Sequence, residues 1–456
     1  MTSREPNNYA VCFRQGDSGL SRQLVSGRDF RLAEWSLCEY ANGLLPRRIA
    51  DLLRVAMSVY TVDRLVRRPR GSADDGWPRT IEITVEVAEP DFWNRAEVRD
   101  ILAEAVGNLL ADDVWDFQFQ GLSGCQYRQE WFDFSLPDRP TVCLYSGGLD
   151  SAAGLALRSQ ELKTVNPVTV WHQPGQRRLV NEQLQSLGQR YGVILRPAII
   201  KAALLKPPRF RYQETTQRCR CFLFTAVGGA VALLLGGSSL EVYESGIGAV
   251  DLPLMCGMVG SKASKGCHPR FLRLMSRLLS LVAEREIVIH LPFLWNTKAE
   301  VVKTLIEDGL GGLAGATVSC AHYPLHESRK HCGVCSNCIL RRQALLVAGF
   351  QEHGQIYKYD LFGQAEATTQ IPDDQLTCLK AVLLRVDELS RLEHGHELPG
   401  FFVRHLRGTG IVSNGESLEP FVELFRRYRQ EWLGVVELGQ RAGWPWAKWL
   451  SFQKAA

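Results

Sequence analysis

The sequence lacks a large excess of charge of either sign, and it lacks a long hydrophobic run. Among its 456 residues, 53 Lys and Arg stand against 49 Asp and Glu, for a net charge of +4. This near balance does not indicate a broad basic surface for wrapping nucleic acid, although a local patch is compatible with it. The longest apolar stretch, 222–235, is shorter than the ~18–20 residues that cross a bilayer, so we expect a buried core helix there.

Signals of export are missing as well. The first ten residues, MTSREPNNYA, are polar and contain no apolar core segment, so we expect no secretory signal. The 13 cysteines are an odd number in a chain without such a signal, which does not favour a disulfide framework. We therefore expect a cytoplasmic protein with mostly reduced cysteines and no membrane association.

The hydrophobic pattern divides the chain into three regions, in line with the two or three domains expected at ~100–200 residues each. Residues 1–137 predict an N-terminal α+β domain, and the segment PDRP at 137–140 predicts a linker. Residues 140–349 alternate strand-like and helical segments, which is typical of a parallel sheet with helices on both faces. Residues 350–456 predict a helical region, in which Trp432, Trp444, Trp446 and Trp449 should anchor the helices or, alternatively, face a partner.

The expected elements follow from apolar periodicity. The N-terminal region predicts helices over 45–67 and 91–110, an exposed turn over 67–78, and strands over 81–87, 114–120 and 129–136. The central region predicts strands over 142–145, 168–171, 193–195 and 240–243, and helices over 152–158, 178–191 and 222–235. Amphipathic helices are expected over 376–392 and 418–438.

A glycine pair follows the first strand of the central region, in the sequence TVCLYSGGLDS at 141–151. Glycines let backbone amides approach an anion closely because no Cβ intervenes, and the next helix adds its positive end. Ser146 and Ser151 offer hydroxyls to phosphate oxygens. The anionic Asp150 should cap the helix or help to hold Mg²⁺. By pattern alone, a glycine pair between a strand and a helix is also a common structural turn.

Four cysteines, Cys320, Cys332, Cys335 and Cys338, have the spacing of metal ligands. Four thiolates close a tetrahedral zinc site, and Cys-x₂-Cys spacing lets two sulfurs reach one metal. No position is left open for water, so the predicted role is structural. An iron–sulfur cluster and scattered buried cysteines are the alternatives.

The string SGGLDS resembles the SGGxDS signature of the PP-loop ATP pyrophosphatases. The resemblance implies a Rossmann-like, adenine nucleotide alpha hydrolase-like fold that splits ATP between the α and β phosphates. Such enzymes adenylate an oxygen of the substrate, and a nucleophile then displaces AMP. On this resemblance the ATP-binding loop consists of Ser146, Gly147, Gly148, Leu149, Asp150 and Ser151, with Mg²⁺ accompanying ATP.

The loop followed by the cysteine array is similar to the QueC family of 7-cyano-7-deazaguanine synthases, over roughly 141–344. Further matches are the segments GQRR at 175–178, WNTKAE at 295–300 and ILR at 339–341. The resemblance implies that Lys298 and Arg220 neutralise phosphate charge, and that Gln176 and Arg177 face the nucleotide or the substrate. Glu244 is a candidate base on position alone, and Asp150 completes the catalytic set.

Two departures from the QueC pattern change the expected reaction. Cys221 stands where QueC carries Asn, and the segment GCHPRF at 266–271 lacks the acid of the QueC substrate segment. About 140 residues also precede the core and about 105 follow it. This layout resembles the extended QueC-like proteins of bacterial anti-phage operons, QatC and the component of type IV CBASS. The resemblance implies coupling of a 7-carboxy-7-deazaguanine-type acid to the N-terminal amine of a partner protein from the same operon.

Three alternatives stay open. The first is a nitrile-forming 7-cyano-7-deazaguanine synthase that uses ammonia. The second is a PP-loop enzyme that modifies tRNA; thiolation would need a reactive cysteine, for which Cys219, Cys221 and Cys267 are available, yet such residues are usually buried small hydrophobes. The third is a non-catalytic subunit of a defence complex that retains a nucleotide pocket.

The cysteine spacing gives a first testable prediction. We expect about one zinc ion per chain in the purified protein, and Cys335→Ser should yield poorly soluble protein because structural metal binding is coupled to folding. Elemental analysis and the soluble fraction of the expressed variant check both parts. A metal-free preparation that is well folded would contradict the structural zinc.

Overall fold

The computed structural model describes residues 9–16, 19, 21–67, 79–110, 113–122, 140–172, 174–205, 214, 218–252, 265–323, 331–352, 354–363, 371–407, 410–412 and 417–449. Three expectations fall outside this part of the chain: the turn over 68–78, the strand over 129–136, and positions 137–139 of the linker. None of the helices described is both long enough and apolar enough for a membrane span.

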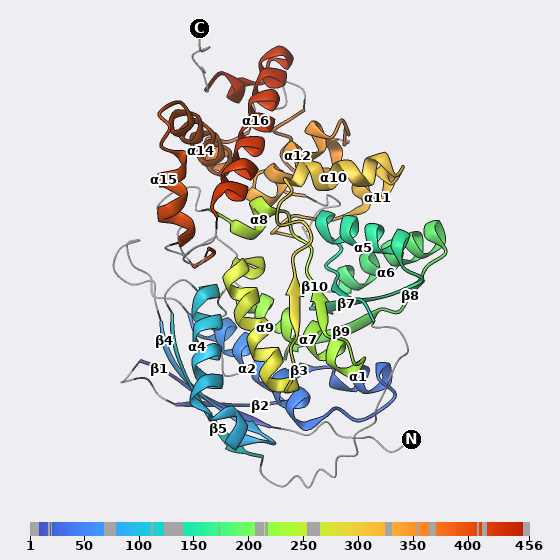
Figure 1. The fold of residues 1–456 in the computed structure, drawn as a ribbon, viewed down its shortest axis with the longest axis vertical. Coiled ribbons are helices and arrows are strands. Elements are labelled where there is room, and N and C mark those ends of the chain that lie inside the picture. The colour runs from blue at the N-terminus through green and yellow to red at the C-terminus, as the bar shows by residue number, and fades with distance from the viewer. Residues whose placement is uncertain are drawn as a thin grey trace.

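A mainly parallel sheet of seven strands forms the centre of the molecule (Figure 1). Its path runs β11-β10-β6-β7-β9-β3, and β8 pairs with β7 beside that path. Every pairing is parallel except that of β3 with β9. This sheet confirms the predicted α/β fold with a Rossmann-like core. The strands are β3 (Phe30–Leu32), β6 (Val142–Leu144), β7 (Thr164–Trp171), β8 (Ile194–Leu195), β9 (Ala198–Leu204), β10 (Ser239–Glu241) and β11 (Val288–His290).

The order of the strands reverses beside β6. The chain passes through α5 (Leu149–Glu161) to β7 and through α6 (Pro174–Tyr191) to β9, on one side of β6. Helix α7 (Arg220–Leu234) then returns it to β10, on the other side. Ligands of open α/β sheets bind at the carboxyl ends of strands where the order reverses. The ends of β6 and β10 are therefore where this fold places a site.

The long apolar run is the buried core helix that the sequence predicts. Helix α7 is buried along most of its length and packs between the sheet and α9 (Pro269–Ala283). Two of its glycines permit this close approach. A Cβ at Gly228 would lie 2.6 Å from the Leu144 side chain, and one at Gly229 would lie 2.5 Å from Leu279.

The N-terminal region forms a second sheet of order β2-β1-β4-β5 (Figure 1). Helix α2 packs on α7 and α4 packs on α9, so one hydrophobic core runs from this sheet into the central one. Arg79 is fully buried and pairs at 2.6 Å with both Asp63 and Asp113. The elements are β1 (Ala10–Gln15), β2 (Arg22–Val25), α1 (Glu34–Tyr40), α2 (Arg47–Leu65), β4 (Thr80–Val87), α3 (Pro90–Trp93), α4 (Ala96–Leu110) and β5 (Val114–Gly121).

Two expectations for this region need correction. The single helix expected over 91–110 is two helices, α3 and α4. The Asn94 side-chain amide between them donates to the Phe119 carbonyl at 2.8 Å and accepts the Phe119 N–H at 3.1 Å. This tertiary pairing with β5 interrupts the helical ladder. Strands β1, β2 and β3 were not predicted, because β1 (AVCFRQ) and β2 (RQLV) do not alternate apolar with polar residues and β3 has only three residues.

The C-terminal region is helical, as predicted, and lies at the opposite end of the molecule from the N-terminal sheet (Figure 1). Trp432, Trp444 and Trp446 are buried in its core, which confirms three of the four expected anchors. Trp449 is 44% exposed, so the expectation was wrong there. The remaining helices are α8 (Gly246–Val250), α10 (Lys298–Glu307), α11 (Gly311–Ala316), α12 (Ser336–Val347), α14 (Thr377–His394), α15 (Leu398–Phe402) and α16 (Glu419–Ala442), with a 3₁₀ turn at Pro445–Trp449.

Two helical glycines provide a matched test of this packing. A Cβ at Gly154 in α5 would lie 2.2 Å from the Tyr243 ring, whereas one at Gly434 in α16 would meet nothing within 4 Å. We expect Gly154→Ala to destabilise the protein by about 1–3 kcal/mol through overpacking. Gly434→Ala should instead stabilise it by about 0.5–1 kcal/mol through helix propensity. Urea unfolding measures both, and equal effects would contradict the close α5–Tyr243 packing.

Candidate active site

The glycine pair forms a tight turn between β6 and α5. Gly147 has a φ of +79°, a left-handed conformation that glycine adopts without strain. Its carbonyl accepts the Val318 N–H at 3.1 Å and the Gln183 side-chain amide at 3.3 Å. The turn is therefore held from two sides by chain segments far away in sequence.

The turn leaves the start of α5 open. The N-cap residue, Gly148, has no side chain, and the first N–H groups of any helix have no intrahelical acceptor. The hydroxyl of Ser146 accepts the Gly148 N–H at 3.2 Å and lies 3.2 Å from the Ser151 hydroxyl. Backbone amides, a helix dipole and two hydroxyls thus gather at one point, an arrangement suited to phosphate oxygens.

Asp150 does not cap α5, contrary to one of the two expected roles. It lies in the first turn of the helix, where one carboxylate oxygen accepts the Ser245 N–H at 3.2 Å and the other accepts the Lys298 ammonium. The Lys298 ammonium also lies 3.4 Å from a Glu244 oxygen. These three predicted residues follow β6, β10 and β11, whose carboxyl ends are adjacent. The strand order thus produces a carboxylate–ammonium–carboxylate cluster.

Burial and charge set the protonation of this cluster. Burial lowers the pKa of Lys298, but Asp150 and Glu244 outweigh it and raise this pKa from 10.5 to about 12. Lys298 therefore stays cationic. Burial, followed by the charge of Asp150, raises the pKa of Glu244 from 4.5 to about 7 against the opposing effect of Lys298. Glu244 can then exchange a proton near neutral pH, as a general base requires.

Arg220 lies apart from this cluster, and it forms no ion pair with it in the described structure. It is the first residue of α7, and its guanidinium lies 5.7 Å from the Phe224 ring. Its Nε is buried with no hydrogen-bond acceptor in the described part of the chain. Burial, Arg220 and Arg64 together lower the pKa of His172 to about 4. Arg220 thus belongs to a cationic neighbourhood at the end of β7.

Gln176 and Arg177 begin α6, close to the same strand end. The Arg177 guanidinium lies 5.9 Å from the Trp171 ring, and the Lys201 ammonium lies 5.2 Å from it. Their predicted contact with nucleotide or substrate stays a prediction.

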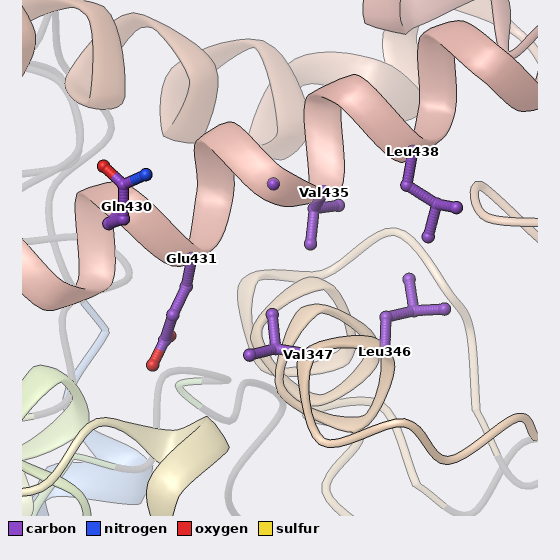
Figure 2. A pocket seen from close by; sticks show the side chains of 7 residues that line it. Leu346, Val347, Gln430, Glu431, Val435 and Leu438 are labelled. Carbon is purple, nitrogen blue, oxygen red and sulfur yellow. The ribbon is translucent and has the colours of Figure 1, made fainter.

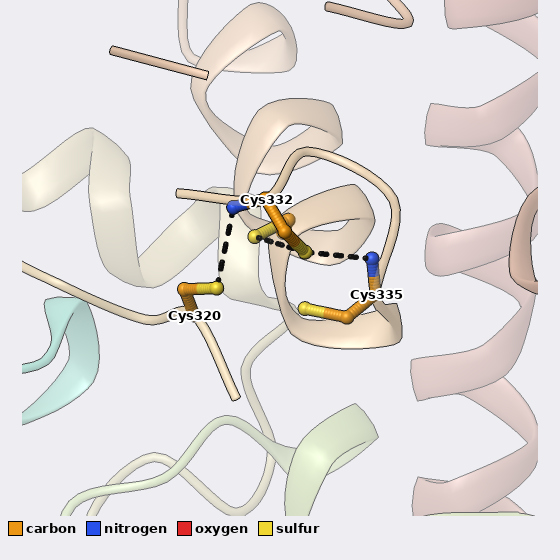
Figure 3. A group of neighbouring side chains, drawn as sticks. Cys320, Cys332 and Cys335 are labelled. Carbon is orange, nitrogen blue, oxygen red and sulfur yellow. Dashed lines mark hydrogen bonds between the residues drawn. The ribbon is translucent and has the colours of Figure 1, made fainter. Parts of the chain in front are cut away.

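The four cysteines come together as their spacing predicts, and Figure 3 shows the labelled sulfurs turned toward one another. All four Sγ atoms are buried and lie within 4.8 Å of one another. Four sulfurs bound to one zinc at about 2.3 Å would be roughly 3.8 Å apart, so this cage fits zinc with a small contraction. Nε2 of the nearby His331 accepts the Ser319 N–H at 3.4 Å. The cysteines alone are therefore sufficient as ligands.

Arg341 connects the cysteine cluster to the phosphate loop. Three residues after Cys338, its guanidinium donates to the Thr317 hydroxyl at 2.6 Å and to the Ala314 carbonyl at 2.7 Å. Thr317 precedes Val318, whose N–H holds the Gly147 carbonyl. The segment that follows the cysteine cluster thus supports the loop through Arg341, Thr317 and Val318. A structural zinc bound by the cysteines would stabilise this support.

Sequence reasoning missed Gln183, Ser245 and Glu431. Gln183 holds the loop, Ser245 fixes Asp150, and the Glu431 carboxylate accepts a hydrogen bond from the Thr297 hydroxyl beside Lys298. Ser245 directly follows the predicted Glu244, which was the available signal. Gln183 and Glu431 lie on polar helix positions that carry no signal, because their partners are distant in sequence.

Comparison with known proteins shows a similarity to one family. Residues 242–349 match the family model described as queuosine biosynthesis protein QueC. The matched stretch contains Glu244, Lys298 and the four cysteines. A 7-cyano-7-deazaguanine synthase of Methylococcus capsulatus is 27% identical over 226 residues, covering 47% of this chain and 97% of that protein. Enzymes of the same name from Kineococcus radiotolerans and Thermoplasma acidophilum are 28% and 24% identical, covering 46% and 49% of this chain and 95% and 94% of those proteins.

The raised pKa of Glu244 predicts a pH dependence of stability. In the unfolded chain this carboxyl loses its proton near pH 4.5, whereas the folded protein keeps it up to about pH 7. Its contribution is therefore fully present below pH 4.5 and is lost as the pH rises to about 7. Glu244→Gln should remove this fall. The free energy of unfolding of the variant, relative to that of wild type, should therefore increase between pH 5 and pH 8. Urea unfolding at both values checks it, and parallel pH profiles would contradict it.

Proposed function

We propose that the protein is an ATP-dependent enzyme that adenylates the carboxylate of a 7-carboxy-7-deazaguanine-type acid and transfers the acyl group to an amine. The observation that carries the proposal is the Asp150–Lys298–Glu244 cluster beside the N-terminus of α5, in which Asp150 and Lys298 are buried and Glu244 is half-buried. In this proposal the cluster supplies a fixed cation and a base next to the amides and hydroxyls that would bind phosphate. The names of the relatives support the deazaguanine class of substrate.

In the first step the loop holds the ATP phosphates through the amides that start α5 and the hydroxyls of Ser146 and Ser151. The acid's oxygen attacks the α phosphorus, the bond to the β phosphate breaks, and pyrophosphate leaves. Lys298 stabilises the charge that develops on the phosphates, because it stays cationic and is already held in place. Arg220, whose Nε has no acceptor in the described structure, offers a second cation.

Mg²⁺ is expected with ATP, and the site offers it a carboxylate. Glu244 uses one oxygen for Lys298, and its other oxygen has no hydrogen-bond donor among the described residues. Carboxylate oxygens are the ligands that Mg²⁺ prefers in proteins. Asp150 and Glu244 would hold the ion only while the polyphosphate is bound, where it would neutralise phosphate charge, so Glu244 would be free to act as the base in the second step.

In the second step the amine nitrogen attacks the acyl carbon, the bond to AMP breaks, and AMP leaves with the electron pair. The amine must lose a proton, and Glu244 accepts it. A base with a pKa near 7 suits this transfer at neutral pH. The product with a primary or N-terminal amine is a substituted amide.

We propose the N-terminal amine of a partner protein as the acceptor, in an anti-phage defence system. The support is the share of the chain outside the matched half, which supplies surface beyond the common core. Ammonia as acceptor, followed by dehydration to a nitrile, is the alternative that the names of the relatives favour. A thiolation of tRNA fits less well: burial raises the pKa of Cys221 and raises that of Cys267 well above its usual range, which disfavours the reactive thiolate.

Two lysines of one helix test the chemistry. Lys298 is buried in the cluster, whereas Lys303 lies on the exposed side of α10. With ATP, magnesium and 7-carboxy-7-deazaguanine, Lys298→Met should lower pyrophosphate release by at least about 100-fold, as expected for removal of a fixed charge at the reacting phosphates. Ser146→Ala and Asp150→Ala should lack AMP formation, and Lys303→Met should match wild type. Retained turnover in the Lys298, Ser146 and Asp150 variants would refute the proposed site.

The acceptor is tested by intact-mass spectrometry of neighbouring gene products expressed together with the enzyme. A mass gain of one deazaguanine acyl group on a partner, absent with Lys298→Met, supports protein conjugation. Formation of the free nitrile from ammonia, with unmodified partners, would show the alternative instead.

A further inference from the structure

Lys298 is the first residue of α10, and its position depends on how that helix begins. Thr297 is the N-cap residue, and its hydroxyl accepts the Glu300 N–H at 3.2 Å. The Glu300 carboxylate accepts the Thr297 N–H in return, at 2.9 Å. This reciprocal capping box fixes the backbone on both sides of Lys298.

The Thr297 hydroxyl that caps the helix also carries a proton that needs a hydrogen-bond acceptor. Thr297 is completely buried, so water cannot accept this proton. The acceptor is the carboxylate of Glu431, which comes from α16 in the C-terminal region. With the proton directed to Glu431, the lone pairs of the hydroxyl point toward the Glu300 N–H. The quality of the cap therefore depends on a residue 134 positions away.

Helix α16 makes a second set of contacts one turn earlier. The Arg427 guanidinium donates to the Glu300 carboxylate at 2.8 Å and to the Trp295 carbonyl at 2.7 Å. The second oxygen of Glu431 is held by the Gln343 amide at 2.9 Å, from α12. Both partners of the capping box are thus tied to α16.

A cavity of ≈ 230 Å³ between α12 and α16 shows which way Glu431 faces (Figure 2). Apolar side chains such as Val347, Val435 and Leu438 line most of it. The Glu431 side chain extends from α16 at one end, away from Leu438. Its carboxylate is engaged by Thr297 and Gln343, so its role is in the contact with α10.

We propose that Glu431 is a positioning residue for Lys298: through the Thr297 hydroxyl it fixes the first turn of α10, so that the Lys298 ammonium stays between Asp150 and Glu244. This inference rests on the proposed function, because it assigns Lys298 to the reacting phosphates. It also makes the C-terminal region part of the active site's framework. Displacement of a reacting group by about 1 Å can cost about 100-fold in rate, so a looser cap should reduce turnover more than substrate binding.

Steady-state kinetics of pyrophosphate release test the proposal. Glu431→Ala should lower kcat by about tenfold or more and change the KM for ATP less than about threefold, as expected for lost positioning. Thr297→Val should do the same. The double variant should be no worse than Thr297→Val alone, because in the proposal Glu431 acts on the cap only through the Thr297 hydroxyl. Glu437→Ala, an exposed acid on the same helix, is the control and should match wild type.

Conservative rescue separates positioning from mere folding. Glu431→Gln keeps an oxygen for the Thr297 proton, and the Gln343 Oε1, which has no donor in the described structure, can turn to accept the new amide. We expect this variant to recover most of kcat. Additive losses in the double variant, or Gln no better than Ala at equal folded fraction, would overturn the proposal.

Hydrogen exchange tests the same claim without any turnover. In Glu431→Ala, amides at 297–301 should exchange at least about tenfold faster than in Glu437→Ala, because a lost helix cap opens the first turn. Exchange at 146–151 should change much less. If wild type releases no pyrophosphate with any acid, the proposed function fails and this exchange decides the inference alone: faster exchange supports it, and unchanged exchange overturns it.

Discussion

The burial of one positive charge determines how this site is built. Lys298 is only 5% exposed, and an uncompensated ammonium at such a position would cost several kcal/mol. Asp150 and Glu244 provide the compensation, and each comes from the end of a different strand. The pairing of β11, β10 and β6 is therefore tied to the electrostatics, because a slip of any strand would separate the charges. In the proposed reaction, the same constraint would keep the cation in place for a phosphate without reorganisation.

The phosphate loop is supported by hydrogen bonds from chain segments that lie far away in sequence. The loop offers its amides outward only if its carbonyls are satisfied behind it, and Gln183 and Val318 satisfy the carbonyl of Gly147. Val318 follows Thr317, whose hydroxyl accepts a hydrogen bond from Arg341, three residues after Cys338. A structural zinc at cysteines that begin 169 positions after Ser151 would thus contribute to the geometry of the proposed ATP site. In the proposed function, this would explain why a zinc site without an open coordination position lies in the same region as the phosphate loop.

The parts that the sequence predicted are those whose chemistry is local. SGGLDS contains its own turn, helix start and hydroxyls, and three of the four cysteines lie within seven residues. Glu244 and Lys298 required the resemblance to QueC, because nothing in their neighbourhood indicates that they meet Asp150. Gln183 and Glu431 could not be found, since each acts on a backbone group or hydroxyl far away in sequence. Asn94 and Trp449 were mispredicted for the same reason, because their structure depends on distant residues. Asn94 interrupts a periodic helix through its contact with Phe119, and Trp449 remains exposed although it follows buried tryptophans.

The regions outside the matched half act on the two helices that present cations. Arg220 and Lys298 are the first residues of α7 and α10, where the helix dipole disfavours positive charge. A residue from outside the matched half contacts the position that precedes each cation. Asp63 of α2 accepts the N–H of Cys219, which precedes Arg220, at 3.3 Å. Glu431 of α16 accepts a hydrogen bond from the hydroxyl of Thr297, which precedes Lys298. A cation in this unfavourable position is a cost to the fold that a bound polyphosphate would offset. The N-terminal and C-terminal regions, at opposite ends of the molecule, therefore both contribute to the framework that positions Arg220 and Lys298 at the proposed nucleotide site (Figure 1).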